Sequence, residues 1–204
     1  DDFILTKDNS NNNYRIVYKY LYNISNSSIR INPLKRYLVE NNWNFTTSFK
    51  FIPNIYKYSS YEQRLELVKG LMDTDGSISK NGNLEFSNSN ETLVDDLASV
   101  LRSMGISCTK GLGRAPHQKI IKGKICNIKQ EYRLYIRTNL NLFNLSRKAE
   151  RIKKKKLFLN NPIVDIVKLG CKKESTCFLV DNEEHLYLTG DFIPTHNSFK
   201  MGSI

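Results

Sequence analysis

Two stretches of the chain carry apolar residues at the three- and four-residue spacing of an amphipathic helix. The first begins at Ser59 and Ser60, two residues of N-cap type, and ends at residues 75–76. Ser59 and Glu62 have the spacing of a capping box. The second follows the N-cap residue Asn90 and runs to residue 104. We predict a helix over each stretch, and a weaker helical pattern at residues 34–38.

Alternating segments around these helices predict two pairs of strands. A type I′ turn at Asn81-Gly82 is expected to join strands at 77–80 and 84–87. Two further strands, over 106–112 and 131–137, flank a Gly-rich basic loop, and a third helix is predicted over 140–159. The order helix, strand pair, helix, strand pair, helix predicts an α+β fold.

The chain changes character after residue 160. Short alternating segments predict strands at 163–169, 176–181, 185–189 and 192–194. About 40 residues seldom fold alone without a disulfide or a metal, so another part of a fold is expected to complete this small β segment. We therefore place a domain boundary at residue 160.

The net charge of +11 is concentrated in one block. Residues 101–160 hold 16 basic and 2 acidic residues, against 11 and 12 in residues 1–100 and 4 and 6 in residues 161–204. A block of this kind attracts phosphate through counterion release, whereas a merely solvated face is the alternative. We expect a polyanion partner, and the candidate contact residues are Arg102, Arg114, Lys119, Lys122, Lys124, Arg133 and Arg137.

Other features of composition narrow the class of protein. No run approaches the roughly 18 apolar residues of a bilayer helix, and no apolar signal segment follows the acidic start, so we expect a soluble intracellular protein without a membrane partner. The four cysteines show no C-x-x-C spacing, which favours reduced thiols over a zinc site or a disulfide framework.

Asp73 and Asp75 lie at the predicted C-terminus of the first helix. The helix dipole disfavours negative charge there, so a compensating cation is expected. A divalent metal is the obvious candidate, since Mg²⁺ binds one or two carboxylates together with substrate phosphate. On these residues alone, an ordinary polar helix end is the better interpretation.

The wider sequence resembles a known family. Lys50-Phe51-Ile52-Pro53 and the run from Arg64 to Ser77, RLELVKGLMDTDGS, resemble the second signature region of LAGLIDADG (DOD-type) homing endonucleases carried in inteins. The resemblance covers about residues 32–151 and implies half of that family's pseudo-twofold fold. It also implies site-specific cleavage of double-stranded DNA for homing, with strands that grip the major groove.

The resemblance assigns roles to several residues. Gly70 would lie where two signature helices meet, Asp75 would bind Mg²⁺, and Lys148 would lie near the scissile phosphate, unless it only neutralises phosphate charge. The family needs an acid from each of two signature helices, and only one such helix is recognisable here. A complementary half, on the same precursor or on a separate chain, is therefore an expected partner.

The second group of candidate residues is His196-Asn197-Ser198. The Asn197 side-chain amide can attack its own carbonyl and break the 197–198 peptide bond as a succinimide forms. His196 can assist proton transfer, and Ser198 supplies a hydroxyl nucleophile. The tripeptide alone is weak support, because Asn and Ser are common in loops.

Residues 177–198, CFLVDNEEHLYLTGDFIPTHNS, resemble the two C-terminal splicing blocks of an intein. The resemblance makes Asn197 the last intein residue and Ser198 the first residue of the C-extein. His185 would assist cyclisation, although a surface histidine at a strand end is the alternative, and Cys177 is expected to pack rather than to act as a nucleophile. No Thr-x-x-His block occurs, so the chain resembles the C-terminal portion of an intein.

These observations predict three segments: an endonuclease half over 1–160, the C-terminal strands of a Hint-type splicing domain over 161–197, and a C-extein remnant over 198–204. The predicted activities are protein splicing without a cofactor and Mg²⁺-dependent DNA cleavage, with the host extein protein as a further partner. The main alternative is a degenerate protein that binds DNA specifically without cleaving it. An RNA-binding maturase is disfavoured by the splicing blocks.

Overall fold

The computed structural model describes residues 2–7, 14–19, 32–43, 49–157, 165–168, 170–171, 174, 180–181 and 183–196. The chain divides into two compact units, Asp1–Lys50 and Phe51–Ile204. The expected boundary at residue 160 lies outside the described residues and stays a prediction. No helix within the described ranges is long and apolar enough to cross a membrane.

The first unit contains a hairpin and a short helix. β1 (Phe3–Lys7) pairs antiparallel with β2 (Tyr14–Tyr18), and α1 spans Pro33–Glu40. Asn32 caps α1, because its Oδ1 accepts the Leu34 N–H at 2.9 Å, while its Nδ2 donates to the Ile16 carbonyl at 2.8 Å. One side chain thus starts the helix and ties it to β2, which confirms the helical pattern at 34–38.

The two main helices of the second unit begin and end close to the predicted positions. α2 spans Asn54–Lys57, α3 spans Tyr61–Asp75 and α4 spans Glu91–Ser103. The N-cap of α3 is Ser60, whose Oγ accepts the Gln63 N–H at 3.3 Å. The predicted capping box is therefore wrong by one residue, because the Ser59 hydroxyl donates to the Tyr56 carbonyl instead.

The cap of α4 matches its prediction. The Asn90 side chain accepts the Leu93 N–H at 3.2 Å. After the helix, Gly105 takes a φ of +74°, which glycine adopts without strain and which lets the chain leave for the next strand.

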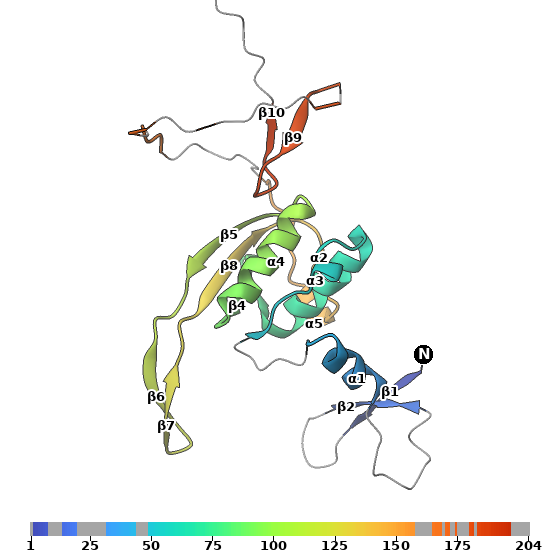
Figure 1. Ribbon diagram of the computed structural model, residues 1–204. Coiled ribbons are helices and arrows are strands. Elements are labelled where there is room, and N and C mark those ends of the chain that lie inside the picture. Colours follow the sequence, from blue (N-terminus) through green and yellow to red (C-terminus); the bar gives the residue numbers. More distant parts are fainter. Residues whose placement is uncertain are drawn as a thin grey trace, which may run out of the picture. The chain divides into compact units, whose positions relative to one another are not determined.

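A four-stranded antiparallel sheet has the strand order β3-β4-β8-β5 (Figure 1). Its strands are β3 (Gly76–Ile78), β4 (Leu84–Asn88), β8 (Tyr132–Arg137) and β5 (Ser107–Leu112), so both predicted strand pairs are confirmed. The turn between β3 and β4 is not type I′, because only Gly82 has a positive φ there. Its N–H donates to the Ser79 carbonyl at 2.9 Å, as in a type I turn followed by a left-handed glycine.

One face of the sheet is buried by α3 and α4. The buried apolar side chains alternate along the strands with exposed or half-buried ones, and the largest that are fully buried are Phe86, Phe143, Met72, Leu97, Leu101 and Leu134. The opposite face carries polar residues. Helices and an antiparallel sheet on one shared core make the fold α+β.

A buried carboxylate fixes the segment before α3. Asp96 in α4 accepts the Ile52 N–H at 2.8 Å and forms an ion pair with Lys57. Because a buried carboxylate is costly without partners, these contacts hold residues 52–57 against α4.

Residues 113–130, predicted as a loop, form a second hairpin. β6 (His117–Ile121) pairs with β7 (Lys124–Ile128) and projects beyond β5 and β8 (Figure 1). Lys122 and Gly123 both have positive φ, the combination of a two-residue type I′ turn. The loop prediction is therefore wrong, since the short alternating segments pair through this turn.

The predicted third helix over 140–159 is also wrong, because within its described part, residues 140–157, only α5 (Ser146–Ala149) forms. Side chains compete with a helical backbone here: the Asn139 side chain bonds both the N–H and the carbonyl of Lys155 at 2.9 Å. Lys153 and Lys156, three positions apart, would also repel each other on a helix.

Of the segments after residue 160, β9 (Leu186–Leu188) and β10 (Pro194–His196) form an antiparallel pair. Residues 165–168 are not in a strand, so the prediction over 163–169 is wrong for them. The predicted strand at 176–181 and the remnant at 198–204 lie largely or wholly outside the described residues.

Candidate functional site

The C-terminus of α3 brings two carboxylates to the point where the helix meets β3. The last turn contains Asp73 and Asp75 but no basic residue. Gly76 follows immediately, and a Cβ at this position would lie 2.5 Å from the Met72 carbonyl oxygen. Only glycine therefore lets β3 leave so closely against the helix end.

The cation that this helix end requires is Lys148. Its Nζ donates to the carbonyls of Met72, Asp73 and Gly76 at 2.9, 2.8 and 2.7 Å, and the residue is 8% exposed. Burial, and secondarily Arg147, lower the pKa of Lys148, while the two nearby aspartates act in the opposite direction. Lys148 is thus a C-terminal cap of α3.

Asp73 in turn caps the N-terminus of α5. Its carboxylate accepts the backbone N–H groups of Asn144 and Leu145 at 3.2 Å, at the N-terminus of that short helix. Asp73 and Lys148 therefore join two segments more than 70 residues apart.

Asp75 is the carboxylate that remains accessible. It is exposed and accepts one hydrogen bond, from Asn88 Nδ2 at 2.8 Å. A single exposed carboxylate fits Mg²⁺, an ion that takes its other ligands from water and substrate phosphate. Within the described ranges no three His, Cys, Asp or Glu side chains gather as a complete metal site.

The polar face of the sheet brings together part of the predicted DNA-binding set. Arg133, Tyr135 and Arg137 occupy every second position of β8 and lie together on the face opposite the core. Arg133 is held by Glu131 at 3.2 Å and by Glu85 at 3.6 Å. These two carboxylates orient the Arg133 side chain and offset part of the positive charge of this face.

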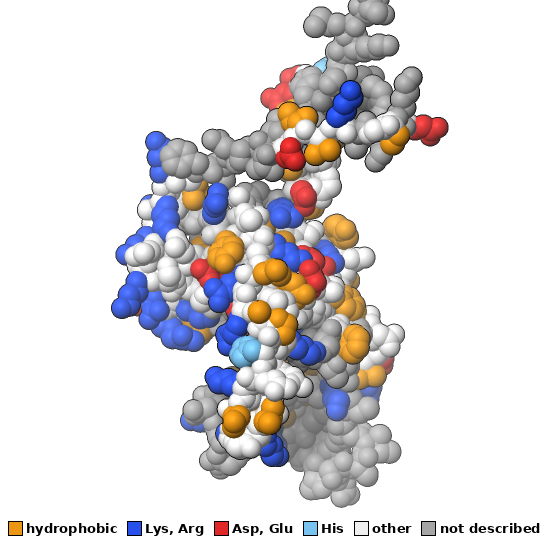
Figure 2. All heavy atoms as spheres, turned by 90° about the vertical axis from the view of Figure 1, so that its left-hand side faces the viewer, with side chains coloured by type: hydrophobic (Ala, Val, Ile, Leu, Met, Phe, Trp, Pro, Cys, Tyr) orange, Lys and Arg blue, Asp and Glu red, His pale blue; other side chains and the backbone are white. Residues whose placement is uncertain are grey.

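The hairpin β6–β7 carries the other predicted basic residues. Lys119 and Lys124 lie on its two strands, Lys122 lies in its turn, and Arg114 lies at its base beside Glu131. Figure 2, which views the molecule from the side of β5 and this hairpin, shows many Lys and Arg side chains on the exposed surface. Sheet and hairpin together form the basic surface of the described chain.

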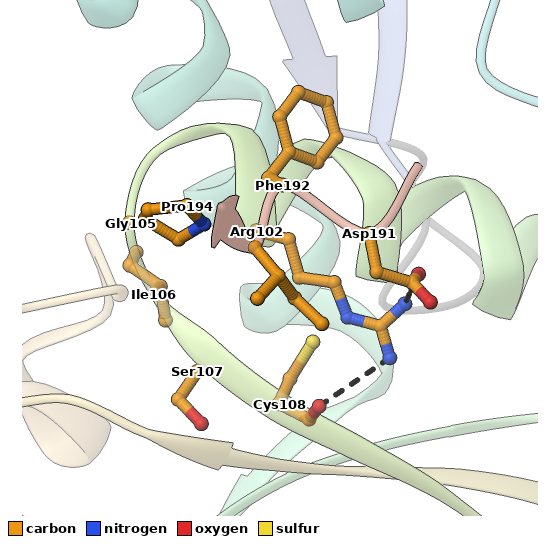
Figure 3. Close-up of a pocket in the computed structure, with 9 residues that line it drawn as sticks. Arg102, Gly105, Ile106, Ser107, Cys108, Asp191, Phe192 and Pro194 are labelled. Atoms are coloured by element: carbon orange, nitrogen blue, oxygen red, sulfur yellow. Dashed lines mark hydrogen bonds and ion pairs between the residues drawn. The ribbon is translucent and has the colours of Figure 1, made fainter. Parts of the chain in front are cut away.

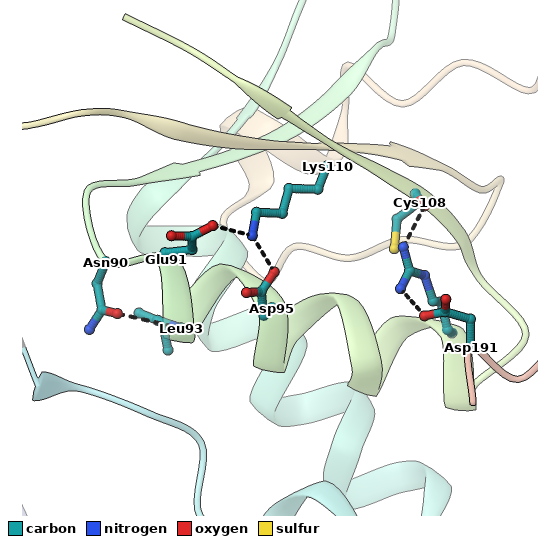
Figure 4. Close-up of polar contacts among 8 residues, drawn as sticks. Asn90, Glu91, Leu93, Asp95, Cys108, Lys110 and Asp191 are labelled. Atoms are coloured by element: carbon teal, nitrogen blue, oxygen red, sulfur yellow. Dashed lines mark hydrogen bonds and ion pairs between the residues drawn. The ribbon is translucent and has the colours of Figure 1, made fainter. Parts of the chain in front are cut away.

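Lys110 lies on the other face of the sheet and does not join this surface. It contacts Glu91 and Asp95 of α4 at 2.7 Å each (Figure 4). The Lys110 ammonium, with a lesser contribution from the Tyr132 hydroxyl, lowers the pKa of Glu91.

Arg102 is separated from the other predicted DNA contacts. It lies near the end of α4, donates to Asp191 at 2.6 Å and to the Cys108 carbonyl at 3.5 Å, and lines a pocket of about 440 Å³. Figure 3 shows this pocket between the end of α4, the start of β5 and the segment around Phe192. Arg102 thus contacts the C-terminal hairpin, and its DNA contact stays a prediction.

The predicted splicing residues lie at the end of the β9–β10 hairpin or outside the described residues. His185 has a φ of +50° and places Nδ1 3.1 Å from the Val180 carbonyl oxygen. His196 is opposite Leu186, the residue that follows His185, so both histidines lie at one end of the hairpin. Asn197, Ser198 and Cys177 lie outside the described residues.

The comparison with known families concerns the part of the chain that contains this site. Residues 62–142 match the LAGLIDADG-like domain. The match includes α3, α4, the sheet and the β6–β7 hairpin, but it ends before Lys148. The matched residues thus include Asp75 and most of the basic surface.

One curated relative is the replicative DNA helicase DnaB of Mycobacterium intracellulare. It is 33% identical to this chain over 155 residues, which are 73% of this chain and 26% of the helicase. The chain therefore spans about a quarter of that relative's length.

Sequence reasoning missed the contacts of Lys148 and Asn88 with the end of α3, and those of Asp73 with Asn144 and Leu145. One signal was present, because acids at a helix C-terminus require a cation, but the sequence could not show that a lysine about 75 positions away supplies one. Asn88 gave no signal of its own.

Proposed function

We propose that the LAGLIDADG-like domain is one half of a homing endonuclease that binds double-stranded DNA and cleaves it with Mg²⁺. The observation that carries this proposal is the state of the two acids at the end of α3. Asp73 is occupied by backbone N–H groups, whereas Asp75 is exposed beside the basic sheet. LAGLIDADG domains are generally nucleases, which agrees with this arrangement.

The residues of the site have different roles in this proposal. Asp75 would hold the ion, with its carboxylate oriented by Asn88, while Lys148 and Asp73 fix the helix end. When bound, Mg²⁺ supplies positive charge to the scissile phosphate and lowers the pKa of bound water. A second acidic helix, from another segment or a second copy, completes the site.

The basic surface supplies most of the binding energy in this proposal. If roughly six of its cations contact phosphates, affinity falls about a thousandfold or more between 50 and 200 mM salt. Replacing Lys119, Lys122 and Lys124 with Gln lowers the slope of log K against log salt by about 2–3. The exposed Lys168, outside this surface, serves as the control, and Lys168→Gln leaves the slope unchanged. A salt-independent affinity would reject the proposal.

The rival function is DNA binding without cleavage. A nicking assay on duplex DNA bound by the protein, with its complementary half and with or without Mg²⁺, separates the two. Cleavage only with Mg²⁺ supports the nuclease. Tight binding with no cleavage under either condition supports the degenerate binder.

We further propose that the C-terminal segment takes part in protein splicing. Two observations support this: His185 and His196 lie at one end of the β9–β10 hairpin, and the helicase matches over only 26% of its length. A local match is what an intein inserted in a host protein would give. Asn197 then cyclises, its amide nitrogen bonding to its own carbonyl carbon as the bond to Ser198 breaks.

The splicing proposal is tested on a precursor carrying a C-terminal reporter and a complementary N-terminal intein segment. Asn197→Ala stops release of the reporter, because no amide nucleophile remains. His196→Ala slows release by about a hundred- to ten-thousandfold. Asn182→Ala, a nearby asparagine without a proposed role, is the control. Release from Asn197→Ala at the parental rate, at the same bond by mass spectrometry, would contradict the proposal.

A further inference from the structure

The β6–β7 hairpin exposes an unusual pair of apolar side chains. Ile120 and Ile125 lie directly opposite each other on the two strands and are 68% and 71% exposed. Gln118 and Asn127 form the next cross-strand pair on the same face, joined by a side-chain hydrogen bond of 3.2 Å. The face therefore presents an isoleucine pair beside an amide pair.

No other described helix or strand packs extensively against this hairpin. An isolated two-stranded hairpin is marginally stable in water, and two isoleucines gain nothing from exposure at its tip. The type I′ turn at Lys122-Gly123 nevertheless holds the strands in register. The pair is thus presented on a defined ribbon for a partner to cover.

The charge around the pair identifies the class of partner. Residues 114–130 contain Arg114, Lys119, Lys122, Lys124 and Lys129 and no Asp or Glu. Figure 2 shows hydrophobic and basic side chains next to each other on the hairpin. A partner that is both polyanionic and locally apolar satisfies this surface.

Duplex DNA has both properties. Its major groove admits a two-stranded β-ribbon, and the C5-methyl group of thymine is the apolar group displayed there. Lys119 and Lys124 alternate with the isoleucines and so lie on the opposite face of the ribbon. Their long side chains would reach past the edges of the ribbon to the phosphates while the isoleucine face meets base edges.

We propose that Ile120 and Ile125 contact thymine methyl groups in the major groove and so determine part of the sequence specificity. This inference rests on the proposed DNA-binding function. It assigns the isoleucine pair a role in specificity and leaves bulk affinity to the lysines.

The test starts with duplexes selected by the full chain from a random pool. Each thymine in a selected duplex is then replaced by uracil, which removes only the methyl group. Burial of one methyl-sized group corresponds to about a fourfold change in affinity. We expect a loss of about this size at one or more thymines for the parent, and no such loss for Ile120→Ser or Ile125→Ser.

Two further variants keep the test interpretable. Ile120→Val retains branched methyl groups and keeps the response to uracil. Ile55→Ser makes the same type of change at an isoleucine 63% exposed in α2, and it also keeps the response.

Four results would overturn the inference. The first is equal binding of the parent to selected duplexes with thymine or uracil at every position. The second is a loss of affinity on uracil substitution that is as large in Ile120→Ser as in the parent. Both leave DNA binding intact and remove only the role of the pair in specificity. Binding to phosphatidylserine vesicles that Ile120→Ser abolishes, with unchanged duplex binding, would assign the pair to a membrane surface. Failure of the parent to bind any duplex would overturn the proposed function as well.

Discussion

Replacing Lys148 with methionine would remove the cation that caps α3 and keep an unbranched stem. Nζ donates to three carbonyls at 2.7–2.9 Å, in a residue that is 8% exposed. A hydrogen bond from a charged donor contributes about 1.5–3 kcal/mol, and a buried carbonyl left unpaired costs about 1–3 kcal/mol. Desolvation of the ammonium opposes these gains, so we expect Lys148→Met to lower the free energy of unfolding by about 3 kcal/mol.

The measurement is thermal and urea unfolding of the full chain, followed by circular dichroism. A loss of about 3 kcal/mol corresponds to a fall in Tm of roughly 6–12 °C. The exposed neighbour gives the matched control, and Arg147→Met should change stability by less than about 0.5 kcal/mol. If Lys148→Met unfolds like the parent, the capping argument is wrong and the ammonium is free for a role at the scissile phosphate.

The pH dependence of stability gives a second readout on Lys148. Burial holds its pKa below the ordinary value of 10.5, so the unfolded chain binds more protons between the two values. The contribution of Lys148 to stability therefore rises with pH from its lowered pKa to 10.5. This rise should be absent in Lys148→Met and present in Arg147→Met.

Two further predictions concern Glu91 of α4 and Cys108 of β5. Lys110 and Tyr132 lower the pKa of Glu91, so its contribution to stability is present above pH 4.5 and is lost as pH falls through the lowered pKa. Thermal melts between about pH 3 and 7 should therefore show a smaller loss of stability at low pH for Glu91→Gln than for the parent. An equal loss in both proteins would contradict this prediction. Burial raises the pKa of the Cys108 thiol, so iodoacetamide should alkylate the exposed Cys171 before Cys108 in the native protein. Peptide mass spectrometry measures the two rates, and equal rates would contradict this prediction.

The elements with strong local signals could be predicted from the sequence. Asn90 and Gly105 mark the ends of α4 because capping and positive φ depend on single residues near the helix. The prediction at 140–159 failed because Asn139 bonds the backbone of Lys155, a contact that periodicity does not reveal. The β6–β7 hairpin was missed because its two strands are only five residues long and each contains a lysine.

The candidate site was predictable only in part. The pattern around Asp73 and Asp75 indicated a helix end in need of positive charge. Which acid is accessible depends on contacts with Asn144, Leu145 and Asn88, which lie 13–72 positions away in the chain. Such pairings follow from the fold as a whole and have no local signature.

The most direct test of the nuclease proposal compares Asp75→Asn with the parent in DNA binding and cleavage. The protein is combined with its complementary half, and both the affinity for a selected duplex and Mg²⁺-dependent nicking are measured. Glu62→Gln changes an exposed acid at the other end of α3, about 20 Å away by helical rise, and is the matched control. The proposal predicts that Asp75→Asn abolishes nicking and leaves the affinity for DNA nearly unchanged, while Glu62→Gln retains both. Nicking by Asp75→Asn at the parental rate, or a loss of DNA binding as large as the loss of nicking, would contradict it.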